Sequence, residues 1–165
     1  MEAVTSSGSA VVTLPTETEI LITREFDAPR HLVFKAYTTP ELIKRWWSGN
    51  QGEVTSADVD LRVGGMWRYV MVANDGSEVA FHGEYREIVP DERIVCTEVY
   101  EMPGAPETEG VLDTLTLTDV DGRTRFTLLV ECGSKDVRDL IMASGMEVGM
   151  QESYDHLEEV ARSLR

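Results

Sequence analysis

The stretch Val63–Val95 decides the fold class of this chain. It begins V-G-G-M-W-R-Y-V-M, passes through the turn Asn74-Asp75-Gly76, and continues from Phe81 as F-H-G-E-Y-R-E-I-V-P-D-E-R-I-V. Large apolar side chains recur at every second residue in both halves, which is the period of a β-strand with one buried face. Asn, Asp and Gly tolerate the positive φ of tight turns, so the stretch predicts a β-hairpin. Its aromatic face is either packed core or the wall of an apolar cavity.

Length and charge exclude several classes of protein. A chain of 165 residues fits one domain with a real core. It carries 30 acidic and 15 basic residues, a formal net charge of −15 that repels phosphate backbones and anionic lipid headgroups. We therefore expect no nucleic-acid partner and no membrane partner. The sequence also has no run of eighteen apolar residues and no secretory signal pattern at its N-terminus.

The cysteines and histidines do not form a recognisable reactive or metal-binding pattern. Cys96 and Cys132 lie in apolar, strand-like runs without metal-type spacing. Buried free thiols are the default for such positions, which favours a reducing, cytoplasmic location. His31, His82 and His156 fall on three separate predicted elements, so no metal site is expected. The sequence also lacks a nucleophile elbow and a phosphate-binding glycine loop. It therefore predicts no cofactor and assigns no catalytic residue.

Turn residues and apolar periodicity divide the rest of the chain. Residues 1–17 are rich in small and polar side chains and are expected to form a flexible lead-in to a single domain over 18–165. Two short helices are predicted after the first strand, starting near Pro29 and Pro40. A loop is predicted over 102–110. The predicted strands are 19–26, 53–61, 66–73, 79–89, 94–101, 111–118 and 124–131.

The C-terminal part has a different period. Residues 134–164 place apolar side chains on one stripe of a helix, with charged residues on the other side. Gly145 and Gly149 each cost about 1 kcal/mol in a helix interior relative to Ala. Their presence indicates a break near Gly145 or a close approach to another surface. This order of elements predicts an α+β fold in which a long helix covers one face of a curved antiparallel sheet.

Several phrases of the sequence resemble a known superfamily. They are R-E-F-D-A-P from Arg24, the pair Trp46-Trp47, the two halves of the hairpin stretch, and G-M-Q-E-S-Y-D-H-L from Gly149. The chain from about Thr18 onward is similar to START-like (SRPBCC) proteins, in the branch named after the activator of the heat-shock-protein-90 ATPase. The resemblance implies a helix-grip fold, in which an antiparallel sheet wraps around a long C-terminal helix and often leaves an apolar cavity.

The resemblance turns the aromatic face into a candidate binding site for a hydrophobic or aromatic small molecule. Alternation places Trp67, Tyr69 and Met71 on the face opposite Arg68, His82, Glu84 and Arg86. Flexible methionines from the C-terminal helix would face these aromatic residues, and residues of the two short helices would close the mouth. The expected ligand-binding residues are Phe34, Trp46, Trp47, Trp67, Tyr69, Met71, Phe81, Tyr85, Met142, Met146 and Met150.

Three other interpretations stay open at this stage. The aromatic and methionine residues could simply fill the core. Glu98, Glu101 and Asp113 lie near the strands that would line a cavity, and a buried carboxyl group can act as a general acid or base in a polyketide cyclase or dehydratase. Surface exposure is the expected fate of these three residues. The resemblance also implies a possible cochaperone, although we expect a single-domain protein without the additional N-terminal domain of the eukaryotic activator. A homodimer is possible.

Overall fold

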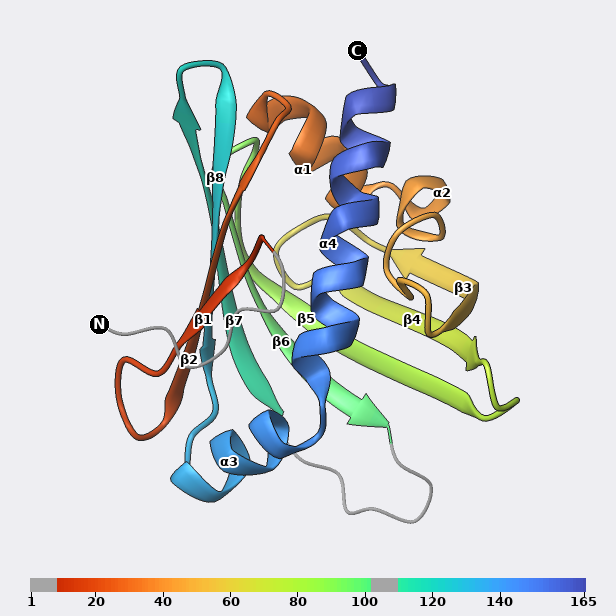
Figure 1. Cartoon of the computed structure of the whole chain (residues 1–165), viewed down its shortest axis with the longest axis vertical. Helices are drawn as coiled ribbons and strands as arrows, with labels where there is room; N and C mark the ends of the chain where they lie inside the picture. Colours follow the sequence, from red (N-terminus) through yellow and green to blue (C-terminus); the bar gives the residue numbers. More distant parts are fainter. Residues whose placement is uncertain (1–8, 102–109) are drawn as a thin grey trace.

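One curved sheet and four helices make up the described part of the protein. The computed structural model describes residues 9–101 and 110–165 (Figure 1). Nearly all of the predicted loop 102–110 lies outside these residues. The strands follow the order β1-β2-β8-β7-β6-β5-β4-β3, and each neighbouring pair is antiparallel. Their bounds are β1 Val11–Thr13, β2 Glu19–Phe26, β3 Gly52–Val59, β4 Met66–Ala73, β5 Glu78–Val89, β6 Arg93–Glu101, β7 Val111–Val120 and β8 Arg123–Glu131.

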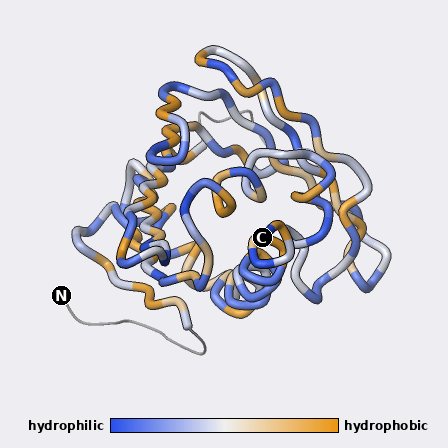
Figure 2. The backbone as a smooth tube through the Cα atoms, turned by 90° about the horizontal axis from the view of Figure 1, so that it is seen from above, coloured by the Kyte–Doolittle hydropathy of each residue, from blue (hydrophilic) through white to orange (hydrophobic). Residues whose placement is uncertain are grey.

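The long C-terminal helix lies inside the curve of the sheet, as Figures 1 and 2 show from two directions. The helices are α1 Arg30–Thr38, α2 Pro40–Ile43, α3 Lys135–Ala143 and α4 Met146–Ser163. The predicted α+β helix-grip architecture is confirmed, including the two short helices after the first long strand. The predicted C-terminal helix is broken at Gly145, whose φ of +80° is a left-handed conformation that favours glycine.

The N-terminal segment differs from the flexible lead-in predicted over 1–17. Val11–Thr13 forms β1, which pairs with β2, and Val12 is fully buried. The backbone of Ala10 donates to Gln151 Oε1 at 3.0 Å and accepts from Gln151 Nε2 at 2.7 Å, so this segment is fastened to α4. A partner on a distant helix leaves no local signal in a sequence rich in Ser and Thr.

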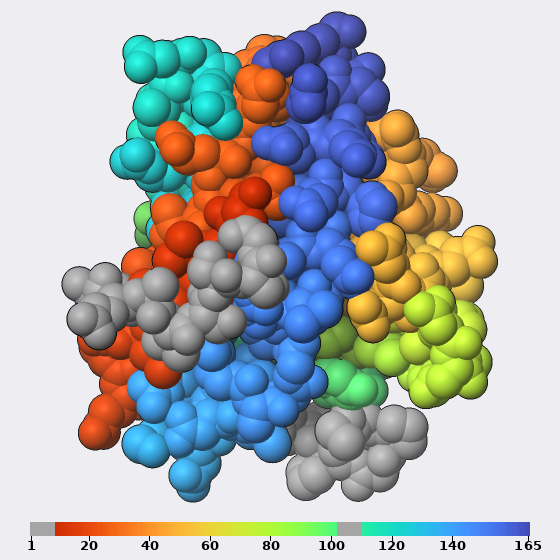
Figure 3. Space-filling view, viewed as in Figure 1, coloured from red at the N-terminus to blue at the C-terminus, as the bar shows by residue number. Residues whose placement is uncertain are grey.

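A packed aromatic cluster fills the space between α4 and the strands β2 and β8. The rings of Phe26 and Phe126 meet edge to face at 5.4 Å, and Tyr154 of α4 meets Phe126 at 4.9 Å. Both phenylalanines and Leu157 are fully buried. In the space-filling view α4 runs across the molecule between the N-terminal strands and the segment around α2 and β3 (Figure 3). The main core of the protein lies beneath it.

None of the helices within residues 9–101 and 110–165 has the length and apolar character that a membrane crossing requires.

Candidate functional site

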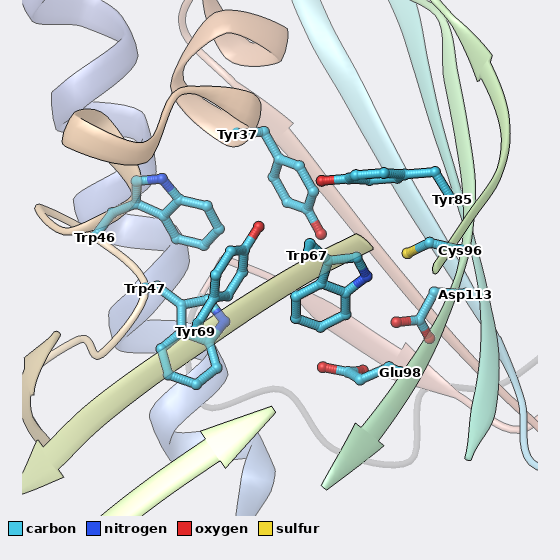
Figure 4. A pocket seen from close by; sticks show the side chains of 9 residues that line it. All are labelled: Tyr37, Trp46, Trp47, Trp67, Tyr69, Tyr85, Cys96, Glu98 and Asp113. Carbon is cyan, nitrogen blue, oxygen red and sulfur yellow. The ribbon is translucent and has the colours of Figure 1, made fainter. Parts of the chain in front are cut away.

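A pocket lies beside the packed cluster, between the sheet and the segment that follows α1. It offers about 40 Å³ to the centres of water-sized molecules. The pocket is therefore small, but it has room for water. Figure 4 shows that its wall combines aromatic rings with two carboxyl groups and a thiol. The lining residues are Tyr37, Trp46, Trp47, Trp67, Tyr69, Tyr85, Cys96, Glu98 and Asp113.

Gly83 on β5 allows Trp67 to lie flat against the sheet. The two residues are direct partners across β4 and β5. A Cβ atom at Gly83 would overlap the carbonyl oxygen of Thr97 and crowd the indole nitrogen of Trp67. Without that atom, Trp67 Nε1 reaches across β5 and donates to the Thr97 carbonyl at 3.2 Å. The space that Gly83 leaves on the inner face is therefore covered by the indole of Trp67.

The other tryptophans close the pocket from the side of the helices. Trp46 is fixed, because its Nε1 donates to the Ala36 carbonyl at 2.9 Å and its ring stacks on Tyr37 at 5.3 Å. Trp47 is only partly buried, and its ring meets those of Tyr69 and Phe81 edge to face, both at 5.4 Å. Trp47 is thus held by weaker contacts than Trp46.

The floor of the pocket consists of side chains in register across three strands. Tyr85 on β5 is the partner of Cys96 on β6, and Cys96 is the partner of Asp113 on β7. Glu98 lies two residues beyond Cys96 and therefore points to the same side. Figure 4 shows its carboxyl group next to that of Asp113, below Trp67. Strand register alone thus brings two carboxyl groups together inside an aromatic pocket.

Each of these two carboxyl groups affects the ionisation of the other. Burial raises the pKa of Glu98. Burial, followed by the negative charge of Glu98, raises the pKa of Asp113 well above its usual range. The proximity of the two acidic groups favours a proton on one of them. The Oδ1 atom of Asp113 is buried and has no hydrogen-bond partner among the described residues.

The remaining polar groups of the pocket are neutral. Burial raises the pKa of the Tyr37, Tyr69 and Tyr85 hydroxyls and of the Cys96 thiol, so all four stay protonated at neutral pH. A protonated thiol is a poor nucleophile, which argues against covalent chemistry at Cys96. The pocket can therefore hold a ligand by apolar contact and hydrogen bonds.

The structure brings five of the expected ligand-binding residues to this pocket and places six elsewhere. Trp46, Trp47, Trp67, Tyr69 and Tyr85 line it. Phe34 and Met71 are buried in the core, and Phe81 packs against Trp47 and Tyr100. The three helix methionines are partly buried against the core and lie outside the lining. These are Met142, Met146 and Met150. The ligand-binding role of all eleven residues stays a prediction.

Four lining residues were not among those expected. They are Tyr37, Cys96, Glu98 and Asp113. Surface exposure was expected for the two carboxylates, and this is wrong, because both face the pocket. Glu101 does lie on the outer face, where Arg68 donates two hydrogen bonds of 2.9 Å to its carboxylate and His82 Nδ1 lies 2.8 Å away. One signal could have revealed Asp113, since it precedes the buried Leu115 and Leu117 at strand spacing.

The fold and the pocket define a helix-grip protein of the START-like (SRPBCC) class. Residues 27–162 match the family described as activator of Hsp90 ATPase homolog 1-like protein, and the chain belongs to this family. No curated protein matches the sequence.

Solved bacterial structures share the fold over almost their whole length. A protein from Rhodobacter sphaeroides is 25% identical, with a TM-score of 0.83 over 93% of this chain and 98% of its own. One from Nitrosomonas europaea is 24% identical, with a TM-score of 0.81 over 92% and 98% of the two chains. An AHSA1-like protein from Aeromonas hydrophila is 20% identical, with a TM-score of 0.66 over 87% and 93%.

Proposed function

We propose that the protein binds a small hydrophobic or aromatic molecule in the pocket beside the packed cluster. The observation that carries this proposal is a cavity walled by six aromatic side chains, where a filled core would leave no space. Tryptophan and tyrosine offer large apolar surfaces together with polar groups that can orient a ligand. Many proteins of this superfamily bind ligands in the corresponding space, which supports the proposal.

The ligand must displace water and widen the pocket. The pocket volume of about 40 Å³ is less than the roughly 150 Å³ of an apolar cavity that binds benzene, and typical ligand pockets are several times larger. Trp47 is the wall residue best suited to yield, because it is partly exposed and held through ring contacts with Tyr69 and Phe81. Its displacement would open the pocket on the side away from the buried floor.

Tryptophan fluorescence gives a direct test, because all three tryptophans of the chain line the pocket. We expect toluene to produce a saturable change. Cys96→Leu, which fills the floor, should weaken toluene binding at least tenfold, on the order of 1.4 kcal/mol. Met146→Trp enlarges a side chain outside the lining and should leave the affinity unchanged. A loss of binding in Met146→Trp alone would show that the ligand binds against α4 instead. The absence of any saturable fluorescence change with toluene would contradict the proposal.

One observation favours an enzymatic second candidate. A carboxyl pair with raised pKa values can exchange a proton with a bound substrate, as a cyclase or dehydratase requires. This candidate predicts turnover of an aromatic or polyketide-like substrate that disappears in Asp113→Asn while binding persists. Binding without any turnover across a panel of such compounds would argue against it.

The remaining predictions rest on sequence and family alone. A cochaperone would bind a chaperone saturably and stimulate its ATP hydrolysis, which a coupled ATPase assay measures. The cytoplasmic location, the possible homodimer and the absence of nucleic-acid and membrane partners also stay predictions.

A further inference from the structure

We infer that the ligand of this pocket carries a basic nitrogen, and that its ammonium group binds the carboxyl pair of Glu98 and Asp113. The inference rests on the proposed function and narrows its ligand to small apolar or aromatic amines. It is drawn from the unsatisfied acidic floor of the pocket, which an apolar ligand alone would leave without partners.

The floor presents an acceptor that lacks a donor. Asp113 is 8% exposed, and its Oδ1 atom has no hydrogen-bond partner among the described residues. An unpaired buried acceptor costs about 1–3 kcal/mol, and more when it is charged. The neighbouring carboxyl of Glu98 offers at most one shared proton. Two carboxyl groups side by side therefore provide several free acceptor positions and, once ionised, a concentrated negative charge.

No basic side chain of the described residues neutralises this charge. The lining contains neither lysine, arginine nor histidine. Arg24, the buried arginine nearest to the packed cluster, is paired with Asp155 at 2.7 Å and Glu158 at 3.3 Å. Arg138 is paired with Asp139 at 2.9 Å. A buried negative charge without a counter-ion is costly, so a cationic ligand gains where a neutral one does not.

The other groups around the pair do not compete for the cation's place. Besides Glu98, the titratable side chains whose pKa Asp113 raises are uncharged in their protonated form: Tyr37 of α1, Tyr154 of α4, Cys96 of β6 and Cys132 after β8. Tyr69 and Tyr85 add further hydroxyls from β4 and β5.

The aromatic wall also suits a cation. In Figure 4 Trp67 lies above the carboxyl group of Glu98 and beside that of Asp113, and its ring is 4.7 Å from that of Tyr69, centroid to centroid. The faces of tryptophan and tyrosine rings attract organic cations, and the attraction grows when water is excluded. An ammonium group placed on the floor would thus meet carboxyl oxygens on one side and aromatic rings on the other.

The test compares benzylamine with toluene and benzyl alcohol, three probes of similar size that differ in one group. Binding is followed by tryptophan fluorescence at about 0.15 M salt, which screens attraction to the acidic surface. We expect benzylamine to bind at least tenfold more tightly than either neutral probe. Asp113→Asn should remove that advantage, so that benzylamine binds the variant no more tightly than toluene does. Glu101→Gln removes a carboxylate from the outer face of the same sheet. This control variant should keep both the affinity for toluene and the tighter binding of benzylamine.

Each outcome decides between the inference and the proposed function. Equal binding of benzylamine and toluene would overturn the amine inference and leave the proposed function standing. Equal binding of benzylamine and benzyl alcohol would show that a neutral hydrogen-bond donor is enough for recognition, which would also overturn the inference. If none of the three binds, both fail. Should Asp113→Asn not fold, Glu98→Gln serves in its place, and an unchanged benzylamine affinity in that variant contradicts the inference.

Discussion

Two neighbouring regions between sheet and helices use the same kinds of side chain in opposite ways. Over β2 and β8, Phe26, Phe126 and Tyr154 interlock edge to face with nothing between them. Over β4 to β7, tryptophan and tyrosine rings surround a cavity whose floor holds two carboxyl groups. Aromatic content alone therefore does not distinguish a core from a pocket. The polar groups that share the inner face make the difference.

The comparison also separates stability from function. A close-packed aromatic cluster contributes dispersion and burial of apolar surface. A buried pair of carboxyl groups lowers the stability of the fold instead, because burial and mutual repulsion disfavour their ionised forms. If the pocket serves a ligand, changes in the packed cluster should affect folding, whereas changes in the pocket floor should affect binding more than folding.

The largest effect on stability is expected in the packed cluster. Phe126→Ala removes a fully buried ring and should lower the free energy of unfolding by about 3–5 kcal/mol. Urea denaturation measures the loss. Toluene affinity, corrected for the folded fraction, should stay unchanged because Phe126 does not line the pocket. Phe126→Leu is the milder variant if Phe126→Ala does not fold. A loss of toluene affinity as large as the loss of stability in this variant would contradict the separation of the packed cluster from the pocket.

A change at Gly83 should have the next largest effect. A Cβ atom there overlaps the Thr97 carbonyl and crowds Trp67, so Gly83→Ala should cost about 1–3 kcal/mol and shift tryptophan fluorescence. Gly149→Ala is the control, because its Cβ would meet only Gln51 Cγ at 3.7 Å within a helix. That variant should gain about 0.5–1 kcal/mol. Equal effects of both substitutions would contradict the role given to Gly83.

The carboxyl pair should make stability depend on pH. Because the folded protein raises the pKa of Asp113, it retains a proton that the unfolded chain releases. Stability should therefore fall as the pH rises from about 4, the ordinary carboxyl range, through the raised pKa of the pair. Asp113→Asn removes one of the two interacting charges, so this decline should shrink. Urea denaturation from about pH 4 to about pH 8 measures it. A decline as steep in the variant as in the wild type would mean that other groups cause it.

The smallest effect is expected on the outer face. Hydrogen bonds from Arg68, followed by those from His82, lower the pKa of Glu101 to about 2. The contribution of Glu101 to stability is complete above the usual glutamate pKa. It is lost as the pH falls from there through the lowered pKa of about 2. Since the side chains of this cluster are 30–46% exposed, Glu101→Gln should cost at most about 1 kcal/mol near neutral pH. Thermal unfolding at neutral and acidic pH measures it, and a larger loss would give this surface a structural role.

The sequence predicted the sheet better than it predicted the pocket. Glu19–Phe26 and Met66–Ala73 form strands with the predicted bounds, because alternation and turn residues are local signals. On β6, however, Cys96 and Glu98 face inward while Val95 and Val99 face outward, so the alternation of polarity does not identify the inner face. The register with β7, which places Asp113 beside them, is a long-range property.

The helix side of the site was also beyond local patterns. The helical period identified the stripe that carries Met146 and Met150, but it could not show how far along the helix the cavity lies. That position depends on the break at Gly145 and on the segment after α2, which brings Trp46 and Trp47 against the strands. On the helix side the pocket is therefore lined by residues of α1 and of the segment after α2. The methionines pack against the core beside the pocket.

The most direct test of the pocket is a crystal structure of the protein soaked with toluene. We expect density for one ring between Trp67, Tyr69 and Tyr85, above the floor formed by Cys96, with Trp47 displaced and the Phe26–Phe126 contact unchanged. An occupied site against Met146 on α4, or a cavity that still contains only water while toluene lies elsewhere, would contradict the account.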